Sequence, residues 1–240
     1  MTTEAISESA PNNREPIASA AHTLGLVLIN VGIAVWGIAG QMRSTGGAAE
    51  HHGVVLLYLS LIAMEWALLY YVWQGARKNA TLFALVGGRW SSLRDVLTDF
   101  GIALPFWVVW ETTAWLVVLV LGPSLAKTLD ILLPRGVIES LLWLALSASA
   151  GFCEEIVYRG YLQRQLRAFT GSGALAVFGQ ALVFGVGHAY QGWNVVVITV
   201  LGVLYGLLVA WRKNLRSSML AHAWSDIYGG YLKFLLPVHA

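Results

Sequence analysis

The sequence contains few charged residues and almost no cysteine. Only 12% of its 240 residues are Asp, Glu, Lys or Arg, against about 25% in an ordinary soluble domain. One cysteine, Cys153, excludes an internal disulfide framework and a zinc cluster built from cysteines. The net charge of +2 gives no ground for nucleic-acid binding, for which basic residues should cluster on one folded face.

A removable leader and an internal repeat are also not evident. The first 16 residues, MTTEAISESAPNNREP, are polar and lack a basic start, a short apolar stretch and a small-residue cleavage site. We expect residues 1–16 to form a disordered cytoplasmic tail. Residues 17–240 are then expected to form a single transmembrane domain.

Apolar residues make up 57% of the chain and recur in runs of about 20, the length of a helix that crosses roughly 30 Å of hydrocarbon. The sequence therefore predicts an all-α, polytopic transmembrane bundle of about seven spans, with six or eight as alternatives. The predicted spans are 20–40, 53–73, 102–121, 137–163, 173–189, 193–211 and 217–236.

The Lys and Arg residues between these spans predict the orientation, because such residues are retained on the cytoplasmic side. Ten fall on the side of the N-terminus: Arg14, Arg77, Lys78, Arg89, Arg94, Arg164, Arg167, Arg212, Lys213 and Arg216. Four fall on the other side: Arg43, Lys127, Arg135 and Lys233. We expect an integral membrane protein with a cytoplasmic N-terminus. In the long connection at 74–101, the spacing of Trp90, Leu93, Val96, Leu97 and Phe100 predicts a short amphipathic helix on the cytoplasmic face.

Ionisable residues inside the apolar runs need a partner, a water cavity or a function, because each costs roughly 2.5 to 3.5 kcal/mol on insertion scales. The segment GFCEEIVYRGYLQRQL (151–166) holds three of them. On a helix, Glu155 and Arg159 lie on one face and are expected to form an ion pair, while the adjacent Glu154 points elsewhere. Glu154 is left as a carboxylate suited to acid or base chemistry.

Two later apolar segments add polar groups. Phe184 and His188 share a helical face in LVFGVGHAYQGW, and His222 and Asp226 share one in SMLAHAWSDIYGG. Because bundles build polar sites from facing helices, these groups and Glu154 are candidates to converge on one water molecule or metal ion. Glu65 and Glu111 lie in earlier spans and are interpreted as packed or interfacial residues.

These segments resemble a known family. EEIVYR at 154–159, FGVGH at 184–188 and HAWSD at 222–226 match, in order, the EExxxR, FxxxH and HxxxN/D motifs of the CAAX prenyl protease and bacteriocin-processing (Abi) family of intramembrane proteases. The resemblance covers residues 137–236. It implies an intramembrane endopeptidase that acts on a membrane-associated peptide or protein in the lipid bilayer, at a site open to the cytoplasmic side.

The resemblance also implies roles for single residues. Glu154 would take a proton from water, and His188 would help to hold that water. His222 and Asp226 would stabilise the oxyanion, while Glu155 and Arg159 would brace the helix and Phe184 would pack. An ionised Asp226 only accepts hydrogen bonds, so it must be protonated, orient His222 or bind a cation.

Two mechanisms follow from these options. A metal-free, glutamate-type protease without a cofactor is favoured. The alternative is a metalloprotease in which Glu154, His188, His222 and Asp226 supply ligands that zinc accepts, although the sequence has no HExxH.

Two other functions stay open at this stage. A non-catalytic immunity or partner-binding protein of the same fold would keep the architecture. A proton-coupled transporter would use buried Glu, His and Asp as relays, but the chain lacks the internal repeat common in such proteins.

The expected depths of Glu154 and His188 in the membrane argue against their meeting at one site. With the span limits above and about 1.5 Å of rise per residue, Glu154 lies near the cytoplasmic end of its span and His188 nearer the outer end. Either the helix at 173–189 begins later, or the span limits are wrong.

Overall fold

The computed structural model describes residues 15–44, 53–121, 133–192 and 194–235, and every regular element in them is helical. The predicted all-α bundle is thereby confirmed. The predicted tail at 1–16 lies almost entirely outside the described residues. In chain order the elements are α1 (Ala20–Ser44), α2 (Val54–Ala76), α3 (Leu82–Val86), α4 (Leu93–Leu121), α5 (Val137–Glu154), η4 (Glu155–Leu162), α6 (Gln163–Thr170), α7 (Gly173–Gly187), η5 (Ala189–Gln191), α8 (Asn194–Arg212) and α9 (Arg216–Leu235).

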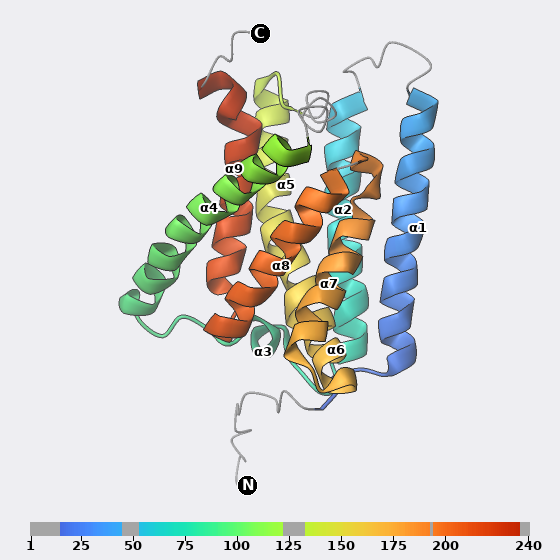
Figure 1. The fold of residues 1–240 in the computed structure, drawn as a ribbon, viewed down its shortest axis with the longest axis vertical. Coiled ribbons are helices and arrows are strands. Elements are labelled where there is room, and N and C mark those ends of the chain that lie inside the picture. Colours follow the sequence, from blue (N-terminus) through green and yellow to red (C-terminus); the bar gives the residue numbers. More distant parts are fainter. Residues whose placement is uncertain (1–14, 45–52, 122–132, 193, 236–240) are drawn as a thin grey trace, which may run out of the picture.

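Each of the seven predicted spans coincides with a helix, and successive long helices run in alternating directions between the two ends of the bundle (Figure 1). Five helical stretches of the described chain are long and apolar enough to cross a membrane: α1, α2, α4, the joined α5–η4–α6 and α8. The other two differ for separate reasons. α7 is apolar but short, with 15 residues, and α9 carries polar residues such as Arg216, His222 and Asp226 along its length.

The outer faces of the long helices are apolar, as a lipid environment requires. Trp36 on α1, Leu56 on α2 and Val120 on α4 are 76%, 72% and 80% exposed. In contrast, the interior contains many polar side chains, including the fully buried Glu155 and Gln180. The bundle therefore has its apolar surface outside and polar groups within, which is the arrangement expected of a membrane protein with an internal polar site.

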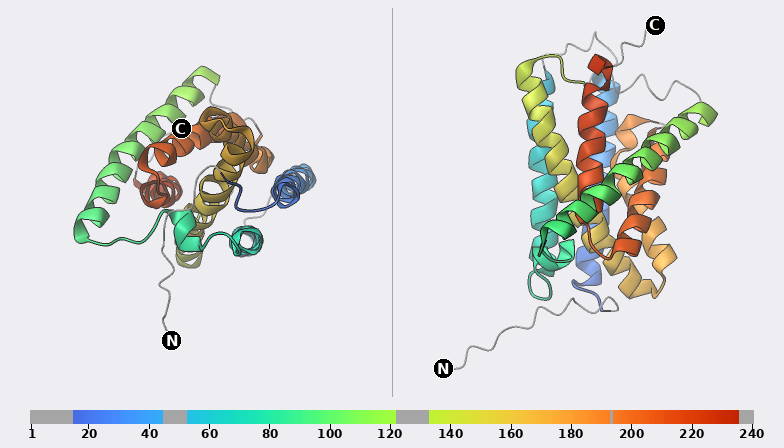
Figure 2. Two further views of the ribbon diagram at one scale, coloured as in Figure 1. Left: turned by 90° about the horizontal axis from the view of Figure 1, so that it is seen from below. Right: turned by 90° about the vertical axis from the view of Figure 1, so that its left-hand side faces the viewer.

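The prediction of a separate amphipathic helix before the third span is wrong. Residues 93–100 form the first turns of α4, which continues without a break through Pro105 to Leu121. α4 crosses the bundle obliquely at its edge (Figure 2). Asp99 explains the continuity, because its buried carboxylate accepts hydrogen bonds from Arg212, Arg216 and Ser217 and so ties the start of α4 to the turn between α8 and α9.

The fourth span is longer than predicted and is not a uniform α-helix. Helical structure runs from Val137 to Thr170, and residues 155–162 form a π-helix in which the N–H of Gln163 donates to the carbonyl of Tyr158. π-Helical turns are rare and occur frequently at functional sites. Gly171, in the left-handed conformation with φ 69°, then ends the helix.

α5 and α9 approach each other closely at Gly151. A Cβ atom at this position would lie 2.8 Å from the backbone nitrogen of Ala223 and 2.9 Å from the carbonyl oxygen of Met219. Both atoms belong to the backbone of α9 and cannot rotate away. Gly151 therefore permits the contact that brings α9, with His222, against the helix that carries Glu154.

Replacement of Gly151 by alanine should destabilise the protein by about 1 to 3 kcal/mol, because the added methyl group forces α9 away from α5. The check is folded yield and thermal unfolding in detergent. Gly32→Ala is the matched control, since a Cβ atom at Gly32 meets nothing within 4 Å. Equal stability of the two variants would contradict the close contact.

Candidate active site

The carboxylate of Glu154, the last residue of α5, faces two imidazoles from two other helices. Its Oε1 lies 4.0 Å from Nε2 of His188, which caps the C-terminus of α7. Its Oε2 lies 3.6 Å from Nε2 of His222 on α9. The Glu154 side chain keeps 14% of its surface exposed, so the structure brings the three groups together in a half-enclosed position.

The observed helix lengths explain how Glu154 and His188 can lie at similar depths. Because the fourth span extends to Thr170, Glu154 lies 16 residues before its end rather than close to it. His188 follows the start of α7 at Gly173 by 15 residues. At about 1.5 Å per residue both side chains lie roughly 22 to 24 Å from the tight turn at 171–172. The predicted end of the fourth span at residue 163 was the error, and α7 does begin at Gly173.

The hydrogen bond of His188 to the backbone assigns its tautomer. Nδ1 lies 2.9 Å from the carbonyl oxygen of Phe184, and a carbonyl only accepts, so Nδ1 carries the proton. In the neutral ring Nε2 is then an acceptor, and it points toward Glu154. A distance of 4.0 Å is too long for a direct hydrogen bond and has the length of a contact bridged by water.

His222 is held by the other glutamate of the pair. Its Nδ1 lies 3.0 Å from Oε1 of Glu155, whose side chain has no exposed surface. The carboxylate accepts this hydrogen bond, so Nε2 of His222 is the nitrogen that faces Glu154. The sequence pattern predicts only that Glu155 pairs with Arg159, and it does not indicate this contact, because the contact joins residues 67 positions apart.

The predicted ion pair between Glu155 and Arg159 is present. Nη1 of Arg159 donates to Oε1 of Glu155 at 2.8 Å, and neither side chain is exposed. The Arg159 guanidinium also lies over the rings of Phe184, at 4.4 Å, and Tyr205, at 5.1 Å. Arg159 thus neutralises the carboxylate that orients His222 and is itself enclosed by aromatic rings.

Aromatic rings form the walls around the two imidazoles. The ring of Phe184 contacts those of His188 and His222 edge-on, at centroid distances of 4.8 Å and 6.1 Å. Tyr205 of α8 stacks on His222 at 5.0 Å. Phe184 thus packs between the two histidines, and Tyr205 is a neighbour that the motifs did not indicate.

Asp226 lies at the exposed side of the group. Its Oδ2 is 3.8 Å from Nε2 of His222, and its side chain is 36% exposed. Asp226 thus faces the same nitrogen as Glu154, while Nδ1 belongs to Glu155. At 3.8 Å the contact between Asp226 and His222 is too long for a hydrogen bond and is electrostatic.

The alternative metal site made of Glu154, His188, His222 and Asp226 is not supported by the geometry. In the parts of the chain that the structure describes, no three side chains of His, Cys, Asp or Glu are arranged so that they could hold a metal ion together. We therefore derive no step that passes through a metal.

Glu65 on α2 is a further carboxyl of this region that was interpreted as a packing residue. It is 5% exposed, and its Oε2 has no hydrogen-bond partner among the described residues. It lies within electrostatic range of Glu154, His222 and Asp226. Glu111, in contrast, accepts a hydrogen bond from Trp107 on its own helix. No sequence pattern separates these two glutamates, because only the packing of α2 against α5 brings Glu65 to the site.

The fold and the site together define a polytopic helical membrane protein with a buried glutamate and two histidines from separate helices. The model of the family described as type II CAAX prenyl endopeptidase Rce1-like matches residues 136–228. This match confirms the resemblance to the CAAX protease family over residues 136–228. Comparison with curated proteins and with solved structures gives no match.

Proposed function

We propose that this protein is an intramembrane endopeptidase of the glutamate type, in which Glu154 activates water. One observation carries the proposal: the carboxylate of Glu154 lies within 4.0 Å of Nε2 atoms of two histidines that come from different helices. Hydrolysis of a peptide bond needs a base for water and a donor for the oxyanion. The site supplies candidates for both.

In the first step, the Glu154 carboxylate takes a proton from a water molecule while the water oxygen bonds to the carbonyl carbon of the substrate. Nε2 of His188 accepts the hydrogen bond of the other O–H of this water, because the proton of the ring is held on Nδ1 by the Phe184 carbonyl. The carbonyl oxygen becomes an oxyanion. His222 in its imidazolium form donates from Nε2 to this oxyanion and from Nδ1 to Glu155.

In the second step, the bond between the carbonyl carbon and the amide nitrogen breaks, and the leaving amine takes the proton from Glu154. The products are a carboxylic acid and an amine, and Glu154 is again a carboxylate. Asp226 stays ionised, and its charge beside Nε2 favours the imidazolium form of His222. No donor role is required of it.

The proposed substrate is a peptide or protein segment associated with the membrane, and the site is proposed to open toward the cytoplasm. The apolar outer faces of the helices favour a substrate that reaches the site from lipid. The basic residues near the α6–α7 and α8–α9 turns favour a cytoplasmic location for that end, and His222 of the site lies six residues after the start of α9 at the same end.

Mapping of protein termini tests the proposed activity. Cells that express the parent chain should contain new termini in membrane proteins, compared with cells that carry an empty vector. Identical termini would exclude an endopeptidase and favour a non-catalytic partner-binding role. Metal analysis of the purified protein tests the glutamate-type mechanism separately, and a stoichiometric metal that activity requires would overturn it.

Replacement of Glu65 by glutamine should lower cleavage while the folded yield stays unchanged. We propose that the Glu65 carboxyl acts on the site through its charge, because it lies within electrostatic range of Glu154, while the two proton transfers described above involve Glu154 alone. Glutamine keeps the size of the side chain but cannot ionise. The measurement is the turnover of a cleaved substrate over a range of pH.

Two further variants make the result specific to Glu65. Glu111→Gln is the matched control, because Glu111 pairs only with Trp107 among its described hydrogen bonds, and it should retain parental activity. Glu65→Asp should recover part of the lost turnover. Parental activity and an unchanged pH profile in Glu65→Gln would show that Glu65 only packs in the interior.

A further inference from the structure

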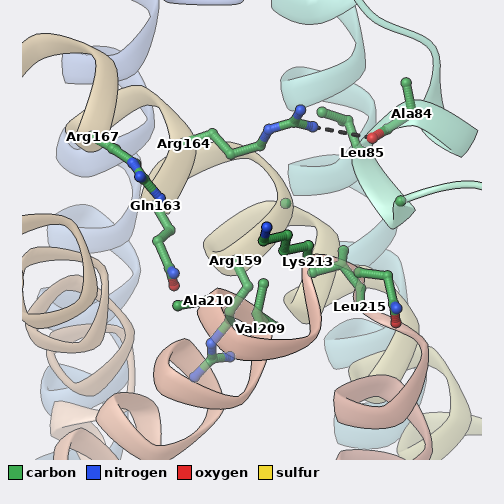
Figure 3. Close-up of a pocket in the computed structure, with 13 residues that line it drawn as sticks. Ala84, Leu85, Arg159, Gln163, Arg164, Arg167, Val209, Ala210, Lys213 and Leu215 are labelled. Atoms are coloured by element: carbon green, nitrogen blue, oxygen red, sulfur yellow. Dashed lines mark hydrogen bonds between the residues drawn. The ribbon is translucent and has the colours of Figure 1, made fainter. Parts of the chain in front are cut away.

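A basic pocket lies apart from the Glu154 carboxylate, at the end of the bundle that holds α3, α6 and the α8–α9 turn. Its volume is about 340 Å³, which is near the lower end of the roughly 300 to 1,000 Å³ typical of small-ligand pockets. Figure 3 shows side chains of α6 and of the α8–α9 turn around it, with Arg164 reaching across to the carbonyl of Ala84. Residues from three parts of the chain therefore form a concave site.

The lining of this pocket is cationic and contains no carboxylate. Four of its residues are basic, namely Arg159, Arg164, Arg167 and Lys213, and none of the described lining residues is Asp or Glu. The Arg159 charge is compensated by Glu155. Arg167 and Lys213 would repel each other across the shared pocket unless an anion lay between them.

Other cations at the same turn form ion pairs with a buried carboxylate. Arg212 and Arg216 pair with the buried Asp99 at 3.0 Å and 2.7 Å. Lys213 lies between them in sequence, yet neither it nor Arg167 forms an ion pair with any described carboxylate. Of the cations that line the pocket, Arg159 is paired with Glu155 and Arg164 donates to the carbonyl of Ala84, which leaves Arg167 and Lys213 available to an anion from outside the chain.

The surroundings of the pocket favour a lipid as its occupant. Trp211, the neighbour of the pocket residue Ala210, is 67% exposed, as expected of an aromatic residue at the membrane interface. Basic pockets between transmembrane helices are a recognised way to hold anionic lipid headgroups. We propose that the pocket binds a phosphate group, supplied by the headgroup of an anionic membrane lipid.

Native mass spectrometry of the full chain tests this proposal, with phosphatidylglycerol and phosphatidylcholine as probes. The parent should bind phosphatidylglycerol in preference to phosphatidylcholine. Each removed cation is expected to weaken binding about fivefold, so Lys213→Gln combined with Arg167→Gln should weaken it by about 25-fold. The charge-preserving pair Lys213→Arg with Arg167→Lys should retain most of the binding.

Arg94→Gln is the matched control, because Arg94 is exposed at the start of α4, near the same end of the bundle, and is not part of the pocket. It should bind phosphatidylglycerol as the parent does. Thermal unfolding of each variant in phosphatidylcholine alone shows whether the fold is preserved. If the double variant unfolds at a lower temperature than the parent, the two single variants replace it, and each is expected to bind phosphatidylglycerol about fivefold more weakly.

The outcomes separate the sources of the phosphate and can overturn the proposal. Binding of inorganic phosphate without any preference for phosphatidylglycerol would assign the pocket to a soluble anion instead of a lipid. Equal binding of phosphatidylglycerol by the parent and a folded double variant would refute phosphate binding in the pocket. It would also be refuted if the parent showed no preference for the anionic lipid and inorganic phosphate had no effect. Because binding is measured without cleavage, failure of this proposal and failure of the proposed protease activity are independent results.

Discussion

Replacement of Glu154 by glutamine is expected to abolish detectable cleavage and to leave the protein folded. The glutamine side chain keeps the size and hydrogen-bonding oxygen of Glu154 but cannot take a proton from water. Loss of a positioned general base lowers the rate by roughly 10² to 10⁴. The side chain is partly exposed, and the two imidazole nitrogens that face it lie 3.6 Å and 4.0 Å away, beyond hydrogen-bond distance, so we expect the fold not to depend on its charge.

The measurement compares the membrane proteome, by terminal peptide mapping, in cells that express the parent, Glu154→Gln or Glu139→Gln. Glu139 lies on the same helix, in its first turn, and accepts a hydrogen bond from the backbone nitrogen of Arg135. Glutamine can still accept that bond, so this control should cleave normally. The same new termini in the Glu154→Gln sample as in the parent would remove Glu154 from the role of base.

Replacement of Arg159 by alanine is expected to prevent stable folding. It leaves the Glu155 carboxylate fully buried without its cation, and the loss of one partner from a buried ion pair costs about 3 to 5 kcal/mol. The cavity left among Phe184 and Tyr205 adds to this cost. Folded yield in membranes and thermal unfolding in detergent are the measurements.

A double variant separates the buried charge from other causes. Glu155→Gln combined with Arg159→Met fills a similar volume and removes both members of the buried ion pair, so it should recover most of the folded yield that Arg159→Ala loses. A double variant as unstable as the single one would show that packing, rather than the unpaired charge, is responsible. Normal yield of Arg159→Ala with lost turnover would instead place Arg159 in the reaction itself.

Much of the fold could be predicted because lipid imposes a simple rule on the chain. A helix that crosses hydrocarbon must be apolar over about 20 residues, and each of the seven apolar runs coincides with a helix. Polar residues within such runs are costly, so Glu154, His188 and His222 could be identified as candidates from their positions alone. The spacing of four also predicted the ion pair between Glu155 and Arg159.

The ends of the helices and the partners of the polar groups could not be predicted in this way. α6 ends at Thr170 because of a turn at Gly171, which lies in a polar segment after the apolar run. The π-helix at 155–162 has no hydropathy signal. The start of α4 at Leu93 depends on Asp99 and its contacts with the α8–α9 turn. Only the start of α4 results from hydrogen bonds between distant segments, whereas the turn at Gly171 and the π-helix are closed by bonds within the segment itself.

The sequence by itself determined that this is a helical membrane protein and which ionisable residues in its apolar runs require an explanation, because the cost of burying charge in lipid depends on local composition. Only the tertiary structure decided that Glu155 holds His222, that Glu65 lies near Glu154, and that Lys213 and Arg167 share a pocket. Each of these relations joins helices far apart in the chain. They depend on how the helices pack, as at Gly151 and Ala223, and local sequence patterns carry no information about such distances.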